Sequence, residues 1–312
     1  MPGTFVPAPP FLTSAAVLRL GPLVKTDVTF TALFVAAVRA RENERTNPLF
    51  RDKLSALLAG REGLEWLAAS EAEPRSNYHR DSFPFLEVRT RFFDDWALEA
   101  VRESKSGQLV ILGAGMDTRA FRLPWPSDLR IWEIDSPELF SLKERRLRSA
   151  GAMLALDRIT VPADLESRDW VSKLVARGLD RGSPTVWLAE GLFQYLPAAV
   201  VGQILRGASS ASSLGSRFGA EVISEDYLRS VSKQRALLRR KGKGTPWVFG
   251  TNDPEALFRS HGWRVDRKVG AMEAAKAMKR WPSSRKNDSG PPDAAFVNAR
   301  KSQTQRLIGK KK

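Results

Sequence analysis

The chain has 312 residues, 42% of them hydrophobic, nine tryptophans and a formal charge of +15, a composition typical of a folded globular protein. Cysteine is absent, which excludes disulfides, thiolate metal ligands and a cysteine nucleophile. His79 and His261 lie beside no other expected ligand, so no metal site is predicted, and no apolar run reaches the roughly 18 to 20 residues of a membrane span.

Residues 1–28 form an N-terminal extension that has no acidic residue before Asp27. An organellar transit peptide can have this composition, but the prolines interrupt an amphipathic helix and no secretory cleavage site is evident. We therefore favour a cytoplasmic protein, with organellar targeting as the alternative.

Helices are predicted next along the chain. Apolar side chains recur at helical spacing over 29–42 and the pattern continues to Gly60, so we expect two helices separated at Asn47-Pro48. A third helix is expected from about Phe85 to Glu103. Because these helices precede the first strand, residues 29–105 are expected to form a helical cap.

Strands alternate with helices after residue 105. Short apolar runs predict five strands, at 108–115, 129–135, 157–165, 183–191 and 216–224. Helices are expected between successive strands, through 137–151, around 169–179 and from near Pro197. This alternation indicates βαβ units and an open, doubly wound α/β sheet.

The chain is strongly basic after the fifth predicted strand. Residues 228–243 contain seven basic residues and no acidic one, which favours a solvated surface helix, and 244–269 are expected to return to the sheet edge. Residues 264–312 contain 14 lysines and arginines against four acidic residues, and we expect 271–312 to be a flexible basic tail. We favour a solubilising role for it over contact with nucleic acid or an acidic surface.

Polar residues end four of the predicted strands, where ligands bind in an open α/β sheet. The first strand ends in Gly113-Ala-Gly115, and about 20 residues on the second ends in Glu133-Ile-Asp135, a place where a carboxylate can accept both ribose hydroxyls. The third ends in Asp164-Leu165, a pair suited to an adenine, and the fourth in Glu190.

These strand ends favour an adenosine ligand. The dinucleotide pattern G-x-G-x-x-G lacks its third glycine, because Thr118 stands there, and no G-x-x-x-x-G-K-[ST] loop is present. An adenosine ligand without phosphates and with an amino-acid-like end is S-adenosylmethionine. An NAD-dependent dehydrogenase is the weaker alternative.

The sequence resembles the leucine carboxyl methyltransferase family, including its bacterial and polyketide-tailoring relatives. The resemblance rests on "TALFVAAVRARENERTNPLF", "VRTRFFDD", "LGAGMDTRAFRL", "WEIDSPELFSLKERRL", "VPADL" and "WLAEGLFQYLP". These motifs cover roughly residues 29–200 in order, and the match is thin after about residue 225. The resemblance implies a class I methyltransferase domain over 29–270, with a mostly parallel Rossmann-like core at 106–270.

The resemblance also implies roles for single residues. Arg89 matches the arginine at the cofactor's carboxylate, Gly113 the glycine against its methionine part, and Glu190 the acid near its amine. Asp135 matches the ribose ligand, and Asp164 and Leu165 match the adenine pair. The predicted cofactor residues are therefore Arg89, Gly113, Gly115, Asp135, Asp164, Leu165 and Glu190.

Two further residues lie close to the matched motifs and are candidates for contact with the acceptor. Arg91 is equally well interpreted as a salt-bridge partner, and Tyr195 as a core residue. Asp117, Thr118, Arg119 and Arg122 are assigned mainly to the start of a helix, where Asp117 or Thr118 can satisfy free N–H groups.

The expected reaction is methylation of an oxygen. A carboxylate has a pKa of about 4, so it is ionised at neutral pH and needs no general base, whereas a phenol or alcohol usually does. Neither histidine falls in a matched motif, which favours a methyl ester formed on a small-molecule carboxylate. The alternatives are a phenol or hydroxyl methyltransferase, a protein C-terminal carboxyl methyltransferase, and a non-catalytic relative that binds RNA or another acidic partner.

Overall fold

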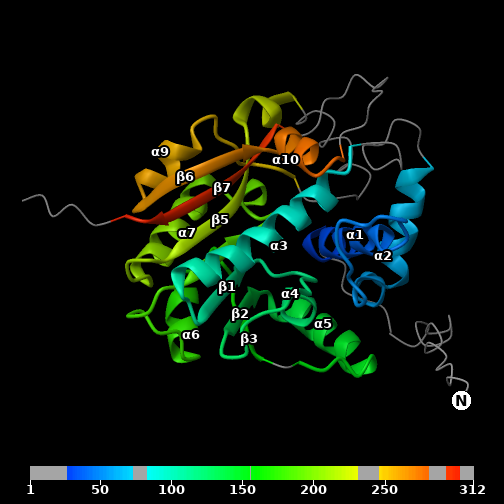
Figure 1. The fold of residues 1–312 in the computed structure, drawn as a ribbon, viewed down its shortest axis with the longest axis horizontal. Coiled ribbons are helices and arrows are strands. Elements are labelled where there is room, and N and C mark those ends of the chain that lie inside the picture. The colour runs from blue at the N-terminus through cyan, green and yellow to red at the C-terminus, as the bar shows by residue number, and fades with distance from the viewer. Residues whose placement is uncertain (1–26, 73–82, 155, 231–245, 281–292, 303–312) are drawn as a thin grey trace, which may run out of the picture.

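The computed structural model describes residues 27–72, 83–154, 156–230, 246–280 and 293–302. They form one twisted seven-stranded sheet with helices on both faces (Figure 1). The strands lie in the order β3-β2-β1-β4-β5-β7-β6. Their bounds are β1 Gln108–Leu112, β2 Arg130–Asp135, β3 Asp157–Pro162, β4 Val186–Ala189, β5 Arg217–Ile223, β6 Trp263–Gly270 and β7 Ala294–Lys301.

The sheet confirms the predicted doubly wound, mostly parallel α/β class. Strands β1 to β5 pair in parallel, with Val110 opposite Trp132 on one side of β1 and opposite Trp187 on the other. Strand β7 is antiparallel to both of its neighbours, β5 and β6. The strand order reverses between β1 and β4, which is the place where open α/β sheets bind ligands.

Alternate strand residues face two separate layers of helices. Val110, Trp132 and Trp187 pack with α6 and α7, whereas Leu109 and Ile131 pack with α3 and α10. Burial on both faces explains why these strands are continuous apolar runs. The helices include α1 Asp27–Glu42, α2 Ser55–Glu71, α3 Phe85–Ser104, α4 Arg119–Arg122, α5 Pro137–Ser149, α6 Trp170–Ala176, α7 Ala198–Ser210, α9 Pro254–Arg259 and α10 Ala271–Ala277. Residues 225–230 are also helical.

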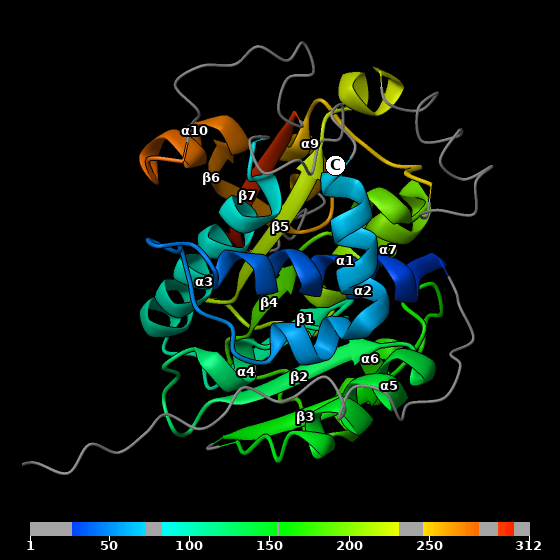
Figure 2. The ribbon, with the colours of Figure 1, turned by 90° about the vertical axis from the view of Figure 1, so that its right-hand side faces the viewer.

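Helices α1 and α2 pack on each other across the ends of the strands (Figure 2). The predicted end near Gly60 is confirmed as a break in the helix, because Gly60 has non-helical φ and ψ, but a further helical segment that was not predicted follows it to Glu71. Gly60 has a φ of 62°, and the Arg146 guanidinium lies where a Cβ would be, so glycine permits both the bend and the close approach. None of the described helices has the length and apolar character of a membrane span.

The expectation of a flexible tail from residue 271 was wrong for the part that the structure describes. Residues 271–277 form α10, and β7 lies inside the sheet with Phe296 and Val297 fully buried. Burial of these apolar side chains stabilises a strand although the residues around it are mostly basic. Strand β6 does return to the sheet edge, as predicted. Residues 231–243 of the predicted basic helix and 303–312 of the tail lie outside the described residues.

Candidate active site

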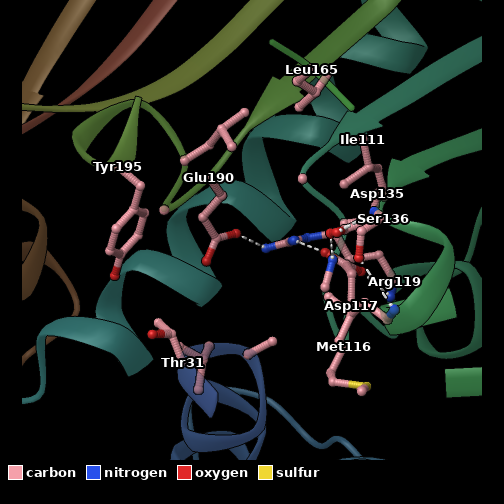
Figure 3. A pocket seen from close by; sticks show the side chains of 18 of the residues that line it. Thr31, Ile111, Met116, Asp117, Arg119, Asp135, Ser136, Leu165, Glu190 and Tyr195 are labelled. Atoms are coloured by element: carbon pink, nitrogen blue, oxygen red, sulfur yellow. Dashed lines mark hydrogen bonds and ion pairs between the residues drawn. The ribbon is translucent and has the colours of Figure 1, made fainter. Parts of the chain in front are cut away.

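A cavity of about 600 Å³ lies beyond the carboxyl ends of β1 to β4, with α1 forming part of its wall. Asp135, Ser136 and Leu165 lie toward one end of it, and Glu190, Tyr195 and Thr31 surround the other (Figure 3). All seven predicted cofactor residues line this cavity: Arg89, Gly113, Gly115, Asp135, Asp164, Leu165 and Glu190.

The glycine turn after β1 is joined directly to the end of β2. Gly113 and Gly115 have φ values of 65° and 47°, a conformation that favours glycine. The Gly115 N–H donates to Oδ2 of Asp135 at 2.7 Å, and the Ser136 N–H donates to Oδ1 at 2.7 Å. Burial raises the pKa of Asp135 more than these two N–H groups lower it. The carboxylate is thereby fixed with its remaining lone pairs available to a ligand.

The start of α5 closes the wall beside Asp135. Ser136 caps this helix by accepting from the Leu139 N–H at 3.3 Å, and Pro137 occupies the first turn, where its missing N–H costs nothing. Beyond β3, Asp164 is exposed and accepts from the Glu166 N–H at 2.8 Å, while Leu165 is buried. An exposed carboxylate and a buried apolar side chain therefore lie side by side on the cavity wall.

Glu190 lies between two arginines at the other end of the cavity. Its Oε1 accepts from Nε of Arg89 at 2.8 Å, and its Oε2 accepts from Nη2 of Arg119 at 2.5 Å. Burial by itself raises the pKa of Glu190, but Arg119 and Arg89 outweigh it and hold that pKa below its usual value. Glu190 therefore stays ionised and is a poor base.

Arg119 is the centre of this ion-pair network, a role that sequence reasoning missed by assigning it to a helix start. Its side chain is 4% exposed and also contacts Asp94, at 2.8 Å, and Asp117. Asp117 accepts from the Arg119 N–H at 2.6 Å, so it does satisfy a free N–H at the start of α4. Burial raises the pKa of Asp117, but Arg119 and more distant cations lower it to about 2.

Glu221 of β5 is a second residue that sequence reasoning missed. Its Oε2 accepts from Nη1 of Arg89 at 2.7 Å, and the side chain is fully buried. The available signal was a single acidic residue in the otherwise apolar strand "FGAEVI". A carboxylate in such a strand is stable only when it is paired, but the sequence gives no indication that Arg89, 132 residues away, is the partner.

The structure separates the two residues predicted to face the acceptor. Tyr195 lines the cavity, at the same end as Thr31 of α1 (Figure 3). Arg91 lies outside it, with its side chain 43% exposed, paired with Asp95 at 2.7 Å and donating to the Leu49 carbonyl. Helix geometry explains this result, because positions two apart on a helix point in nearly opposite directions and Arg89 faces the cavity.

No histidine lies in the described part of the cavity wall. The Nδ1 of His261 lies 2.7 Å from the Leu257 carbonyl oxygen, at the end of α9, and His79 lies outside the described residues. Within the described wall, the groups best suited to act as a general base are carboxylates. Among them, Glu190 is held by two arginines.

Comparison with known proteins shows the family of this chain. The family model of leucine carboxyl methyltransferases matches residues 32–209. A Mycolicibacterium smegmatis protein named as an S-adenosyl-L-methionine-dependent methyltransferase is 34% identical over 275 residues, covering 81% of this chain and 86% of its own length. A Frankia alni protein with the same description is 42% identical over 251 residues, covering 79% of this chain and 86% of its own length.

Solved structures share the fold at lower sequence identity. A methyltransferase structure from Thermobifida fusca has a TM-score of 0.53 and 16% identity, over 92% of this chain and 97% of that one. A protein from Streptomyces avermitilis has a TM-score of 0.52 and 13% identity, over 85% of this chain and 96% of its own. The family match and the close relatives together show that the chain belongs to the leucine carboxyl methyltransferase family and is an S-adenosylmethionine-dependent methyltransferase.

Proposed function

We propose that this enzyme methylates a carboxylate of a small molecule to give a methyl ester. The observation on which the proposal rests is that the cavity joins a complete set of groups suited to S-adenosylmethionine to an acceptor end with hydroxyls and no free base in its described wall. When bound, S-adenosylmethionine supplies the methyl group, and its sulfur takes the electron pair of the broken S–CH3 bond.

The cavity residues suit this cofactor by their chemistry and position. Asp135 is held by two backbone N–H groups with lone pairs left for ribose hydroxyls, and Asp164 and Leu165 offer an acceptor and an apolar surface to adenine. Arg89 and Glu190, already paired, offer a cation to the cofactor's carboxylate and an anion to its amine. Asp164, Asp135, Gly113 and Glu190 lie at the ends of β3, β2, β1 and β4, which is the order of these strands across the sheet.

The acceptor end favours a nucleophile that is already ionised. Glu190 has both oxygens bound by guanidinium groups, so it is poorly placed to remove a proton from a phenol or alcohol. The hydroxyls of Tyr195 and Thr31 can orient an acceptor oxygen, and Val35, Leu192 and Leu196 give the wall an apolar surface that excludes water. A carboxylate loses its negative charge when it accepts the methyl group. An apolar wall favours this loss of charge.

A small acceptor suits the size of the cavity, because about 600 Å³ lies in the usual range for sites that hold small molecules. The phenol or hydroxyl methyltransferase and the protein C-terminal carboxyl methyltransferase are the alternatives that the test must separate. A cytoplasmic location, and weak contact of the basic C-terminal residues with acidic partners, remain predictions from the sequence.

The test uses S-adenosylmethionine with a labelled methyl group and three sets of acceptors: small carboxylic acids, phenols, and peptides with a free carboxyl terminus. A methyl ester releases labelled methanol in mild alkali, whereas a methyl ether does not. We expect alkali-labile label on a small acid and a rate that is flat with pH once the acid is ionised. Alkali-stable label, with a rate that rises toward the pKa of a phenol, would establish the hydroxyl alternative instead.

A further inference from the structure

The four arginines of the cavity wall pair with three acids that lie behind them, outside the cavity. Arg39 pairs with Asp52 at 2.9 Å, and Arg89 with Glu221 at 2.7 Å. Arg119 and Arg122 both pair with Asp94, which is 2% exposed. In each of these pairs, the carboxylate offsets positive charge that the arginine would otherwise present to the cavity.

The wall itself has an excess of acid in a protein that is strongly basic overall. Its charged members are four arginines and six acids, which gives a formal charge of −2 against +15 for the whole chain. The arginines are Arg39, Arg89, Arg119 and Arg122, and the acids are Asp117, Asp135, Glu138, Asp164, Glu166 and Glu190. The three carboxylates behind the arginines, Asp52, Asp94 and Glu221, add further negative charge around the cavity.

This charge distinguishes the two forms of the cofactor that the enzyme must exchange. S-adenosylmethionine and its demethylated product, S-adenosylhomocysteine, share the adenosine, the amine and the carboxylate. They differ by one methyl group and by the positive charge on sulfur. At the methionine end, where Glu190 lies between Arg89 and Arg119, a carboxylate behind the arginines therefore favours the methyl donor over the product.

We propose that Glu221 is a positioning and specificity residue, which favours S-adenosylmethionine over S-adenosylhomocysteine through its negative charge behind Arg89. The carboxylate holds Nη1 of Arg89 while Glu190 holds Nε, so the guanidinium is fixed between them. Without the charge of Glu221, only Glu190 offsets the positive charge of Arg89. The inference rests on the proposed place of the cofactor and not on the identity of the acceptor.

Glu221 suits this task better than the exposed acids of the wall. It is fully buried, and charges in the interior act on each other with little screening by solvent, whereas Glu138, Asp164 and Glu166 face water. Burial raises the pKa of Glu221, but the direct ion pair with Arg89 opposes that rise. At an effective dielectric of about 20, one unit charge acting over a distance on the order of 10 Å changes affinity on the order of tenfold.

The test is to titrate S-adenosylmethionine and S-adenosylhomocysteine separately into the wild type and Glu221→Gln, by calorimetry at neutral pH and without acceptor. We expect the ratio of the two dissociation constants, product over donor, to fall about tenfold in Glu221→Gln. A merely structural role for Glu221 would weaken both ligands alike and leave this ratio unchanged. Glu221→Asp, which keeps the charge, should restore the wild-type ratio even if its melting temperature is lower.

Glu133→Gln is the matched control. Glu133 is also fully buried, in the neighbouring part of the sheet, but its partners are Lys143 and Arg158, which do not line the cavity. Its ratio should stay within about twofold of the wild type. If Glu221→Gln does not fold, Glu221→Met removes the same charge without leaving a polar group to bury, and gives the same readout.

The outcomes separate this inference from the proposed function. A ratio that stays within about twofold in the neutral Glu221 variants overturns the role of Glu221 and leaves carboxyl methylation untouched. The same drop in Glu133→Gln would also overturn it, because the effect would then belong to any buried carboxylate. Failure of the wild type to bind S-adenosylmethionine would instead contradict the cofactor site itself.

Discussion

Replacement of Arg119 by methionine should lower the free energy of unfolding more than the same replacement of any exposed arginine. The guanidinium is 4% exposed and contacts Asp94, Glu190 and Asp117. Asp94 and Glu190 each keep a second arginine after the change, whereas Asp117 keeps no ion pair among the described residues. The variant therefore leaves the largely buried Asp117 carboxylate with the backbone N–H of residue 119 but without an ion pair.

The pKa of Asp117 gives part of the magnitude. It is about 2 in the folded protein against an ordinary value of 3.8, because Arg119 outweighs the effect of burial. At about 1.4 kcal/mol per pKa unit, this difference corresponds to about 2 kcal/mol of stability at neutral pH. Breaking a buried ion pair from one side typically costs about 3 to 5 kcal/mol, so we expect a loss in that range.

The assay is urea unfolding followed by tryptophan fluorescence, with Arg91→Met as the matched control. Arg91 forms an exposed pair with Asp95, so its replacement should cost under about 1 kcal/mol. Because the folded-state pKa of Asp117 is depressed, its stabilisation is complete above about pH 4 and is lost as the pH falls through about 2. The gap between wild type and Arg119→Met should therefore be constant near neutral pH and narrow in acid.

A loss for Arg119→Met no larger than that for Arg91→Met would refute this reasoning. So would a gap that widens as the pH falls below about 4, since Asp117 then needs no cation. The narrowing in acid is what separates the loss of an ion pair from a loss of packing, which does not depend on pH.

Three further predictions follow from the fold and the cavity. In Asp135→Asn, an NH2 donor takes the place of a carboxylate oxygen that accepts from a backbone N–H. Affinity for S-adenosylmethionine, measured by calorimetry, should therefore fall about 10- to 100-fold. Gly219→Ala places a Cβ 2.4 Å from the Trp96 ring, and this overpacking should cost about 1 to 3 kcal/mol in urea unfolding. A chain that ends at residue 280 lacks β7, which pairs with both β5 and β6, and should lose cooperative thermal unfolding by circular dichroism.

Each of these has a control within the same chain. Glu133→Gln removes a buried carboxylate of the same strand outside the cavity and should leave affinity for S-adenosylmethionine nearly unchanged. At Gly107 an added Cβ meets nothing within 4 Å, so Gly107→Ala should be close to neutral. A chain that ends at residue 302 keeps β7 and should unfold cooperatively. If the chain that ends at 302 also loses cooperative unfolding, the absence of β7 does not explain that loss.

The strand ends around the cavity could be predicted because their arrangement follows from local patterns. Short apolar runs closed by glycine or acid mark parallel strands, and the carboxyl ends of parallel strands meet at one edge of a sheet. Gly113, Asp135, Asp164 and Glu190 line one cavity for this reason. The cap helices were predicted equally well up to Gly60, where the Arg146 side chain of the distant helix α5 packs against the bend.

The sequence predicted both Arg89 and Arg91 at the site, although residues two apart on a helix point in nearly opposite directions. The structure places Arg89 in the cavity wall and Arg91 outside it. The place of β7 was beyond prediction for a different reason. Its neighbours β5 and β6 both precede it along the chain, and its basic surroundings resemble those of a tail. Pairing between strands depends on side chains far apart in sequence.

The sequence by itself determined the α/β class, the strand ends that line the cavity, and the family. The tertiary structure decided which charges meet. Arg89 lies 101 residues from Glu190 and 132 from Glu221, and both acids bind it. A buried charge accepts whichever opposite charge the fold brings within about 3 Å, and no local pattern records that distance.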